Sequence, residues 1–275
     1  MFVPSLINPP EILDLRGVSM LRWFSRHEGI RPMLVDWGHP AAGVDTQDVS
    51  GHVEQLLVPL IEALDEPPIL IGYCLGGTIA AAAAALTKVR ALGLIAAPWR
   101  FSGFGEAALA EIDALWQAAE PTCRSLGLVP MEVLQSGFWR LDPARTVAKF
   151  ERFGTLEPGS PQARSFVTLE DWANAGAPLT YAAGRQMFDD FFAADMPGKG
   201  RWSVGGQVID PLNLDIPTVE FLSTTDRIVP ATSAVGLADQ HITSAGHVGM
   251  VIGSGRRNVL WLPLRDWIRG RVLTK

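Results

Sequence analysis

The chain has 275 residues, of which 48% are hydrophobic and 19% charged, and its formal net charge is −6 at pH 7. A composition this close to the globular average excludes a disordered or fibrous chain, and the length corresponds to roughly one or two domains. The negative charge argues against a nucleic-acid partner, and two cysteines cannot form the disulfide framework of a small secreted protein. We therefore expect a folded protein from a reducing compartment, with the cytoplasm as its default location.

Neither an export signal nor a membrane span is predicted. The N-terminal stretch lacks a basic region and contains Pro4, Pro9 and Pro10 where a signal peptide needs a continuous apolar run. Residues 67–87 carry no charge, but prolines and glycines interrupt them and their second half is mostly alanine. A buried strand, a tight turn and a buried helix explain this segment better than a transmembrane helix does.

The first part of the chain alternates short apolar runs with helical patterns. We expect strands over residues 2–7, 32–37, 69–72 and 92–97, and helices over residues 19–27, 46–66 and 78–86. In the second of these helices, apolar residues recur every third or fourth position despite Pro59. Alternation of this kind is typical of a parallel sheet flanked by helices.

The alternation stops after residue 98. Residues 99–211 are rich in helix formers and aromatic side chains, which predicts an inserted helical cap. We interpret these aromatics mainly as packed core, with a substrate-lining role as the alternative. The sheet pattern resumes over residues 217–223 and 240–244, and a helix is expected over residues 258–272. The predicted α/β core therefore comprises residues 1–98 and 212–275.

A short motif, Gly72-Tyr-Cys74-Leu-Gly76, follows the third expected strand and precedes an alanine-rich helix. Glycines two positions before and after a nucleophile are typical of the nucleophile elbow, a sharp strand-to-helix turn in which side chains would clash. Because the turn sets Cys74 at a helix N-terminus, where N–H groups and the helix dipole favour a thiolate, we predict that it is a nucleophile. The alternative, a small buried hydrophobic residue, suits Cys123, which has no such context.

An elbow nucleophile needs a base and an orienting acid, which follow it along the chain in the order acid, then histidine. Asp226 comes directly after the strand expected over residues 217–223, and His247 lies in the loop after the next strand. We predict Asp226 as the acid, with an ordinary turn aspartate as the alternative. His247 is the predicted base, and its main rival is His39, which precedes Cys74 in the chain.

The oxyanion hole is predicted to use the backbone N–H of Leu75 and a second N–H from the loop after the first strand. Within that loop, around residues 6–8, we assign the second N–H to Ile7. No metal and no cofactor is expected, because the five histidines and two cysteines show no ligand spacing. The Gly205-Gly206 pair does not belong to a dinucleotide fingerprint.

Four stretches of the chain carry a wider similarity. They are Val3-Pro-Ser-Leu-Ile-Asn8 with Ile12-Leu-Asp-Leu15, Gly72-Tyr-Cys-Leu-Gly-Gly77, Asp226-Arg-Ile-Val-Pro230, and Gly246-His247. Together they resemble the polyhydroxyalkanoate synthase family, cysteine-dependent acyltransferases with the α/β-hydrolase fold. The resemblance implies a 3-hydroxyacyl-coenzyme A substrate and an acyl group carried on Cys74. His247 would be the base, and Asp226 the acid that also helps to activate the substrate hydroxyl.

The resemblance also implies strands that precede the first matched strand in other family members. We therefore expect the early strands of the hydrolase sheet to be missing here, leaving an edge that a second copy or a partner subunit would cover. Two other functions stay open. The same three residues could serve a thioesterase or esterase, or the chain could be an inactive subunit that binds polymer granules or another synthase subunit.

Overall fold

The computed structural model describes residues 1–27, 29–43, 45–141 and 143–273. Its centre is a sheet of five parallel strands in the order β1-β4-β5-β10-β11. The bounds are Phe2–Val3 for β1, Ile69–Tyr73 for β4, Ala91–Ile95 for β5, Thr218–Ser223 for β10 and Gln240–Thr243 for β11. The strand expected over residues 32–37 forms only a bridge between Leu34 and Phe2, on the edge of β1 away from β4.

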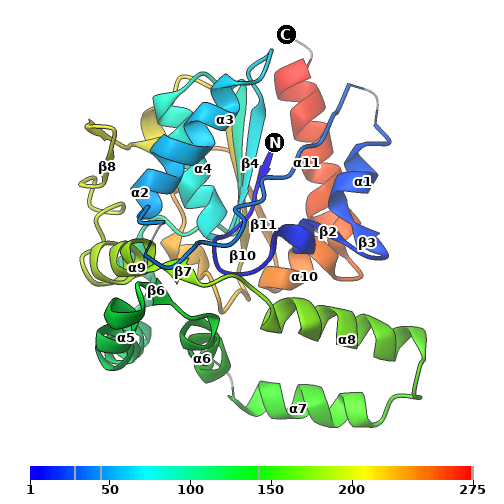
Figure 1. Cartoon of the computed structure of the whole chain (residues 1–275). Coiled ribbons are helices and arrows are strands. Elements are labelled where there is room, and N and C mark those ends of the chain that lie inside the picture. The colour runs from blue at the N-terminus through cyan, green and yellow to red at the C-terminus, as the bar shows by residue number, and fades with distance from the viewer. Residues whose placement is uncertain (28, 44, 142, 274–275) are drawn as a thin grey trace.

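Helices cover both faces of the sheet (Figure 1). One face carries α4 (Leu75–Leu86) and a continuous helical segment made of α2 (Val49–Gly51), η2 (His52–Leu57) and α3 (Val58–Glu62). The other face carries α1 (Met20–Phe24), α10 (His247–Ile252) and the C-terminal helical run of η7 (Arg257–Trp261), α11 (Leu262–Trp267) and η8 (Ile268–Leu273). The two layers of helices give the sheet the buried environment that parallel strands require.

Two hydrophobic clusters hold these layers to the sheet. On the α4 side, Leu70 and Leu92 pack with Ile79 and Leu57, none of which is exposed. On the α11 side, Ile71 and Phe221 pack with Leu264 and neighbouring residues. Successive residues of a strand point to opposite faces, so Leu70 and Ile71 serve different clusters. The predicted fold of a mostly parallel sheet between two helical layers is confirmed.

The helix expected over residues 46–66 is shorter than the apolar pattern predicts. It begins at Val49 because the Asp48 carboxylate caps it by accepting the Gly51 N–H at 2.6 Å. The turns before Pro59 are widened into a π-helix, and the Val58 N–H donates to the Val53 carbonyl. Because a proline lacks an N–H and crowds the preceding turn, Pro59 accounts for the π-helical hydrogen bonding in the turns before it.

The expected helix over residues 19–27 is also shorter than predicted. It spans Met20–Phe24, with the Ser19 hydroxyl accepting the Arg22 N–H at its start. Gly29 has a positive φ of 78°, but it does not cap this helix, because the C-cap residue is Ser25 and Gly29 lies five residues beyond Phe24. Before this helix, η1 (Pro10–Leu13) leads into a short hairpin of β2 (Asp14–Leu15) and β3 (Val18–Ser19).

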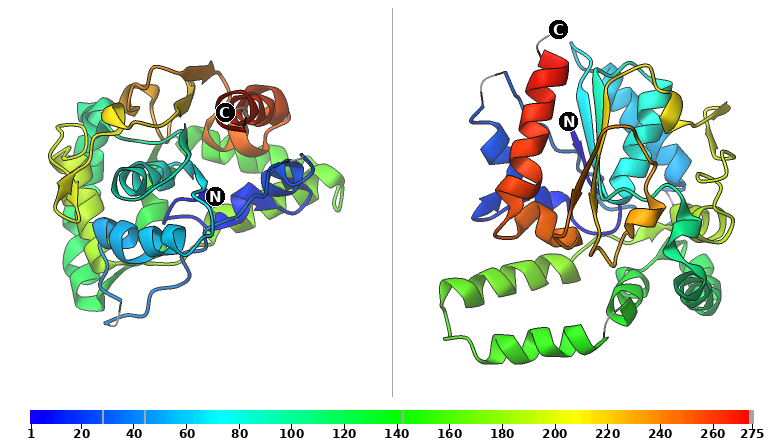
Figure 2. Two further views of the ribbon diagram at one scale, coloured as in Figure 1. Left: turned by 90° about the horizontal axis from the view of Figure 1, so that it is seen from above. Right: turned by 180° about the vertical axis from the view of Figure 1, so that it is seen from behind.

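The segment between β5 and β10 is largely helical and is called the insertion below. Its elements are η3 (Phe101–Phe104), α5 (Glu106–Leu126), β6 (Leu128–Val129), α6 (Met131–Leu141), α7 (Pro143–Gly154), α8 (Pro161–Asn174), β7 (Leu179–Thr180), α9 (Tyr181–Arg185) and η4 (Gln186–Ala193). These helices gather at the end of the sheet where β4 meets α4, and α7 and α8 form a projecting pair (Figures 1 and 2). They adjoin the motif that contains Cys74.

A tight hairpin follows the insertion helices. It joins β8 (Ser203–Val204) to β9 (Gln207–Val208) through Gly205 and Gly206, whose φ values are 57° and 77°. Two consecutive positive φ values match the turn type that fits the twist of a two-residue hairpin, which explains the glycine pair. The chain then returns to β10 through η5 (Pro211–Asn213). In the ranges that the structure describes, no helix has both the length and the apolar character needed to cross a membrane.

Candidate active site

Cys74 occupies the tight turn between β4 and α4, with φ 55° and ψ −134°. This backbone conformation is strained for a residue with a side chain and costs roughly 1–3 kcal/mol. Backbone hydrogen bonds hold it in place: the Cys74 N–H donates to the Ile95 carbonyl at 3.0 Å, and the Gly77 N–H donates to the Cys74 carbonyl at 2.8 Å. The turn presents the thiol as a partly exposed group at the start of α4.

The glycines around Cys74 allow β1, β4 and α4 to approach one another closely. A Cβ atom on Gly72 would lie 2.3 Å from the Cα of Gly77. A Cβ atom on Gly76 would lie 2.2 Å from the Val3 carbonyl oxygen at the end of β1. Both positions therefore have no room for a side chain, and the local geometry is that of a nucleophile elbow.

His247 and Asp226 form a buried pair beside this turn. The His247 Nδ1 atom lies 2.6 Å from the Asp226 Oδ2 atom. The other carboxylate oxygen of Asp226 accepts the N–H groups of Ile228 and Val229 at 2.8 and 2.9 Å. Because its carboxylate is fixed at both oxygens, Asp226 holds the His247 ring in one orientation and leaves Nε2 for another partner.

The structure differs from the sequence-based expectation in the setting of His247. The residue was expected in a loop, but it is the first residue of the short helix α10. Gly246 precedes it in an extended conformation, with φ −62° and ψ 167°, and provides the turn from β11 into the helix. Starting a helix at His247 fixes its backbone, which contributes to the position of the ring.

Tyr73 forms the floor beneath His247, a role that the sequence analysis did not predict. Its ring stacks on the imidazole with centroids 5.0 Å apart, and its hydroxyl donates to the His247 carbonyl at 3.4 Å. Burial, with the nearby charges of Cys74 and Asp226, raises the pKa of Tyr73 well above its usual value. The phenol therefore stays neutral. In the sequence, the one sign of the contact between Tyr73 and His247 is that Tyr73 directly precedes Cys74 at the end of β4.

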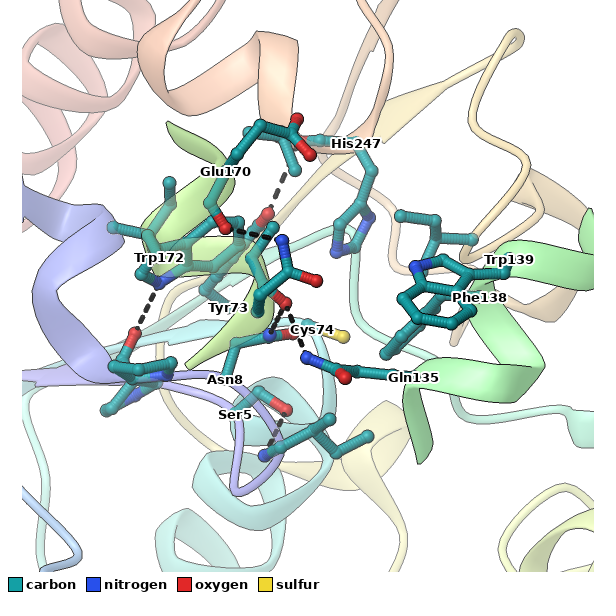
Figure 3. A pocket seen from close by; sticks show the side chains of 18 of the residues that line it. Ser5, Asn8, Tyr73, Cys74, Gln135, Phe138, Trp139, Glu170, Trp172 and His247 are labelled. Carbon is teal, nitrogen blue, oxygen red and sulfur yellow. Dashed lines mark hydrogen bonds between the residues drawn. The ribbon is translucent and has the colours of Figure 1, made fainter. Parts of the chain in front are cut away.

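The electrostatic environment favours a protonated His247. Burial by itself would lower the pKa of His247, but the charge of Cys74 and hydrogen bonds with Asp226 and Cys74 outweigh it and raise this pKa to about 10. Figure 3 shows the His247 ring and the Cys74 sulfur in one cavity. An imidazolium beside the sulfur stabilises negative charge on it, which is the condition for a reactive cysteine. The three side chains predicted from the sequence are thus brought together.

Two cavities meet at Cys74. The first, of about 200 Å³, includes polar side chains from several elements, among them Asn8, Gln135, Glu170, Asn174 and His247 (Figure 3). The second, of about 190 Å³, is lined mainly by apolar side chains of the insertion, among them Phe101, Phe104, Leu115, Leu134, Phe188 and Phe192. Both cavities are lined by Ile7, Cys74, Phe138 and Ile228. The first cavity, called the polar cavity below because of these side chains, is also lined by apolar residues such as Ile12 and Trp172. The second is called the apolar cavity, and ligand groups in either cavity can reach the same sulfur atom.

The two residues predicted for the oxyanion hole lie beside Cys74. Leu75 is the first residue of α4, so its N–H has no acceptor within the helix. Ile7 lines both cavities, but its N–H donates to the Ser5 hydroxyl at 3.2 Å, since a serine readily bonds a backbone N–H two residues on. The place of Leu75 at the start of α4 is compatible with a donor role, and both oxyanion donors stay predictions.

The rival residues of the sequence analysis lie elsewhere. His39 is exposed and does not line either cavity at Cys74. Cys123 is only 1% exposed, and burial together with the charge of Glu120 raises the pKa of its thiol. Among the residues described, no group of three or more His, Cys, Asp or Glu side chains is arranged to hold a metal ion.

Most of the chain matches a known protein family. Residues 18–256 match the model of a family described as the alpha/beta hydrolase family. The chain belongs to the alpha/beta hydrolase family. A monoacylglycerol lipase from Paleococcus ferrophilus has a similar structure, with a TM-score of 0.58 over 97% of this chain and 91% of that one at 16% identity. A likeness at this identity shows the α/β-hydrolase fold, and the fold prediction is confirmed.

Curated relatives of this α/β-hydrolase carry a more specific name. A poly(3-hydroxyalkanoate) polymerase subunit PhaC from Haloferax mediterranei is 26% identical over 98% of this chain and 58% of the relative. The protein of the same name from Haloarcula marismortui is 25% identical over 98% of this chain and 60% of the relative. The resemblance to polyhydroxyalkanoate synthases is thus confirmed, and the chain spans about 60% of the length of these relatives.

Proposed function

We propose that this chain is a cysteine-dependent acyltransferase of the polyhydroxyalkanoate synthase type. The observation that carries the proposal is the grouping of Cys74, His247 and Asp226 at the junction of two cavities. The similarity to proteins named poly(3-hydroxyalkanoate) polymerase subunit supports a 3-hydroxyacyl-coenzyme A substrate.

In the first step, the Cys74 sulfur attacks the thioester carbonyl of the substrate. A bond forms between this sulfur and the acyl carbon, the bond from that carbon to the coenzyme A sulfur breaks, and His247 supplies the proton that the leaving thiolate takes up. The N–H of Leu75 is proposed to stabilise the oxyanion that develops on the way. Exchange of one thioester for another is close to thermoneutral, so the acyl group remains activated on Cys74. A serine ester would lose that activation.

In the second step, the hydroxyl of another 3-hydroxyacyl group attacks the acyl-cysteine. His247, oriented by Asp226, takes the hydroxyl proton, an ester bond forms, and the bond from the acyl carbon to the Cys74 sulfur breaks. By the family resemblance, Asp226 also helps to activate that hydroxyl. The product is an acyl chain longer by one unit, and Cys74 is free for the next cycle.

Water competes with the hydroxyl in the second step, and the insertion is proposed to exclude it. Residues 99–211 act in this proposal as a cap over the core formed by residues 1–98 and 212–275. The helices α5 and α6 and the segment η4 contribute the apolar wall of the second cavity. An apolar wall disfavours water near the acyl-cysteine and so favours transfer over hydrolysis.

The proposal extends to the setting of the protein. A 3-hydroxyacyl-coenzyme A substrate is consistent with a cytoplasmic location, and a water-insoluble polyester product would keep the protein at polymer granules. The edge of the sheet beyond Leu34 is proposed to be covered by a second copy of the chain or by a partner subunit. Size-exclusion chromatography with light scattering would distinguish a monomer from these assemblies.

The experiment that tests the proposal uses 3-hydroxybutyryl-coenzyme A. Purified protein should release free coenzyme A thiol and form oligomeric ester, and Cys74→Ala should abolish both. Thiol release with only free hydroxy acid as product would identify a thioesterase instead. A well-folded chain that releases no thiol would be an inactive subunit, and the proposal would be wrong. Cys123→Ala is the matched control, and we expect it to retain activity because Cys123 lies away from both cavities.

A further inference from the structure

Helix α6 forms the wall between the two cavities at Cys74. Leu134 and Gly137 line the apolar cavity, whereas Gln135 and Trp139 line the polar one. Phe138 lines both. Residues three or four apart share one face of a helix, so adjacent stripes of α6 face different cavities. Helix α6 therefore separates the two cavities that reach the sulfur.

The polar cavity offers fixed amide and carbonyl groups. The side-chain amides of Asn8 and Gln135 donate to the Ala173 carbonyl at 3.3 and 3.4 Å. The Lys149 ammonium pairs with the Glu170 carboxylate at 2.8 Å, and both residues line the same cavity. Groups of this kind suit a ligand segment that contains amides, such as the pantetheine arm of coenzyme A.

The apolar cavity offers a largely hydrocarbon surface and is partly open to solvent. Its lining is mainly aromatic and aliphatic, and the exceptions include Glu111 and Arg227. A dry cavity of about 150 Å³ in another protein holds a benzene molecule, which has six carbon atoms. At about 190 Å³, this cavity has room for a hydrocarbon group of similar or slightly greater size. A methyl group would leave most of it empty.

We propose that the apolar cavity binds the hydrocarbon substituent of the acyl group, that it accepts substituents much longer than methyl, and that Gly137 sets the limit of their length. The proposal rests on the acyltransferase function proposed above, and it adds the substrate class: 3-hydroxyacyl thioesters with substituents of several carbons. The thioester carrier then approaches through the polar cavity. The thioester carbonyl lies at Cys74, where the two cavities meet.

Gly137 is the position at which α6 leaves space open. A Cβ atom built there would lie 3.4 Å from the Leu115 Cδ2 atom, which is an ordinary contact. A first side-chain atom is therefore tolerated, and a longer side chain would extend along the wall toward the cavity. Alanine in a helix is also favoured over glycine by about 1 kcal/mol, so substitutions here are compatible with α6. Gly137→Leu should shorten the cavity without unfolding the helix.

The first test measures the space around the sulfur and needs no acyl transfer. Cys74 reacts with alkyl methanethiosulfonates, in which the sulfur forms a disulfide with the alkylthio group and methanesulfinate leaves. For each variant we compare two rate constants for modification of Cys74, one with the hexyl and one with the methyl reagent. We expect the hexyl-to-methyl ratio to fall at least tenfold in Gly137→Leu relative to the wild type. Ser136→Leu places the same side chain at the neighbouring position, which lines neither cavity, and should keep the wild-type ratio. Intact mass identifies single modification.

Two results of this test would overturn the proposal: an unchanged ratio in Gly137→Leu, or an equal fall in Ser136→Leu. If Gly137→Leu does not fold, Ala108→Leu narrows the same cavity from α5 and should produce the same selective loss. An unchanged ratio in Ala108→Leu would then overturn it.

The second test measures coenzyme A release from 3-hydroxybutyryl- and 3-hydroxyoctanoyl-coenzyme A. We expect the wild type to accept both, and Gly137→Leu to lose at least tenfold more activity on the longer substrate. Equal losses on both substrates would contradict the assignment of the cavity. If the wild type releases no coenzyme A from either substrate, the proposed function fails. The hexyl-to-methyl ratio of rate constants from the first test still decides whether Gly137 limits the cavity.

Discussion

His247 and Asp226 are 21 residues apart in the sequence, yet the Nδ1 atom of one lies 2.6 Å from the Oδ2 atom of the other. Neither side chain is appreciably exposed, since the values are 7% for His247 and 0% for Asp226. A buried charged hydrogen bond of this kind is directional and poorly screened by water. It fixes the tautomer and the orientation in which the imidazole meets Cys74.

Replacing Asp226 by asparagine tests this orientation. The asparagine oxygen can still accept the N–H groups of Ile228 and Val229, so the loop should keep its shape. Its amide group would then face the His247 ring, which would have to accept a hydrogen bond at Nδ1 and carry its proton on Nε2. We expect coenzyme A release to fall by about 10²- to 10⁴-fold with an unchanged circular dichroism spectrum. Near-wild-type activity in Asp226→Asn would show that the pair does not orient the base.

The raised pKa of His247 predicts a dependence of stability on pH. Its value in the folded protein is about 10, against 6.5 for an unperturbed histidine. A group whose pKa is raised on folding stabilises the protein fully below the unfolded value, and this contribution is lost as the pH rises from 6.5 through about 10. We expect the free energy of unfolding in urea to fall over this window by at least about 1 kcal/mol more in the wild type than in His247→Gln. If the free energy of unfolding changed with pH in the same way in both proteins, the raised pKa of His247 would be contradicted.

The two cysteines should differ strongly in their reaction with iodoacetamide. Cys74 is partly exposed and lies beside a protonated imidazole, whereas Cys123 is 1% exposed and has a raised pKa. At pH 7 we expect Cys74 to be alkylated at least tenfold faster than Cys123, as read from peptide mass spectra. His247→Gln should slow the reaction of Cys74 and leave Cys123 unchanged. Equal rates for the two thiols would count against an activated Cys74.

The close contact at the elbow predicts a large effect of one methyl group. In Gly76→Ala, the added Cβ would lie 2.2 Å from the Val3 carbonyl oxygen and 2.4 Å from the Pro4 carbonyl oxygen, so the backbone must shift. We expect a loss of about 3 kcal/mol or more in the free energy of unfolding, beyond the usual range for a single substitution. Gly154→Ala meets nothing within 4 Å and should be neutral or slightly stabilising in thermal unfolding. Similar melting temperatures for both variants would contradict the packing described.

The sequence was sufficient to predict the elbow and the two residues that meet it. Gly72 and Gly76 signal a backbone approach that excludes side chains, and this signal is local. The order of Asp226 and His247 after late strands follows from parallel topology, which brings the carboxyl ends of strands to one edge. Local patterns and chain order thus predicted most of the core and its candidate site.

The rest depends on contacts between segments whose spacing no local pattern encodes. The expected strand over residues 32–37 is reduced to one bridge because Leu34 pairs only with the short strand β1. The stacking of Tyr73 on His247 joins residues 174 positions apart, as does the hydrogen bond between them. The division of the site by α6 arises from how the insertion helices pack over Cys74, and the amphipathic pattern of α6 does not specify its partners.

The formation of an acyl group on Cys74 is the most direct test of the proposed mechanism. Protein mixed with 3-hydroxybutyryl-coenzyme A, quenched in acid within seconds and digested, should yield the peptide containing Cys74 with the mass of one or more hydroxybutyryl groups added. The adduct should be cleaved by neutral hydroxylamine, as a thioester is, and should be absent from Cys74→Ala. Coenzyme A release without any adduct on this peptide, or an equal adduct in Cys74→Ala, would contradict the mechanism.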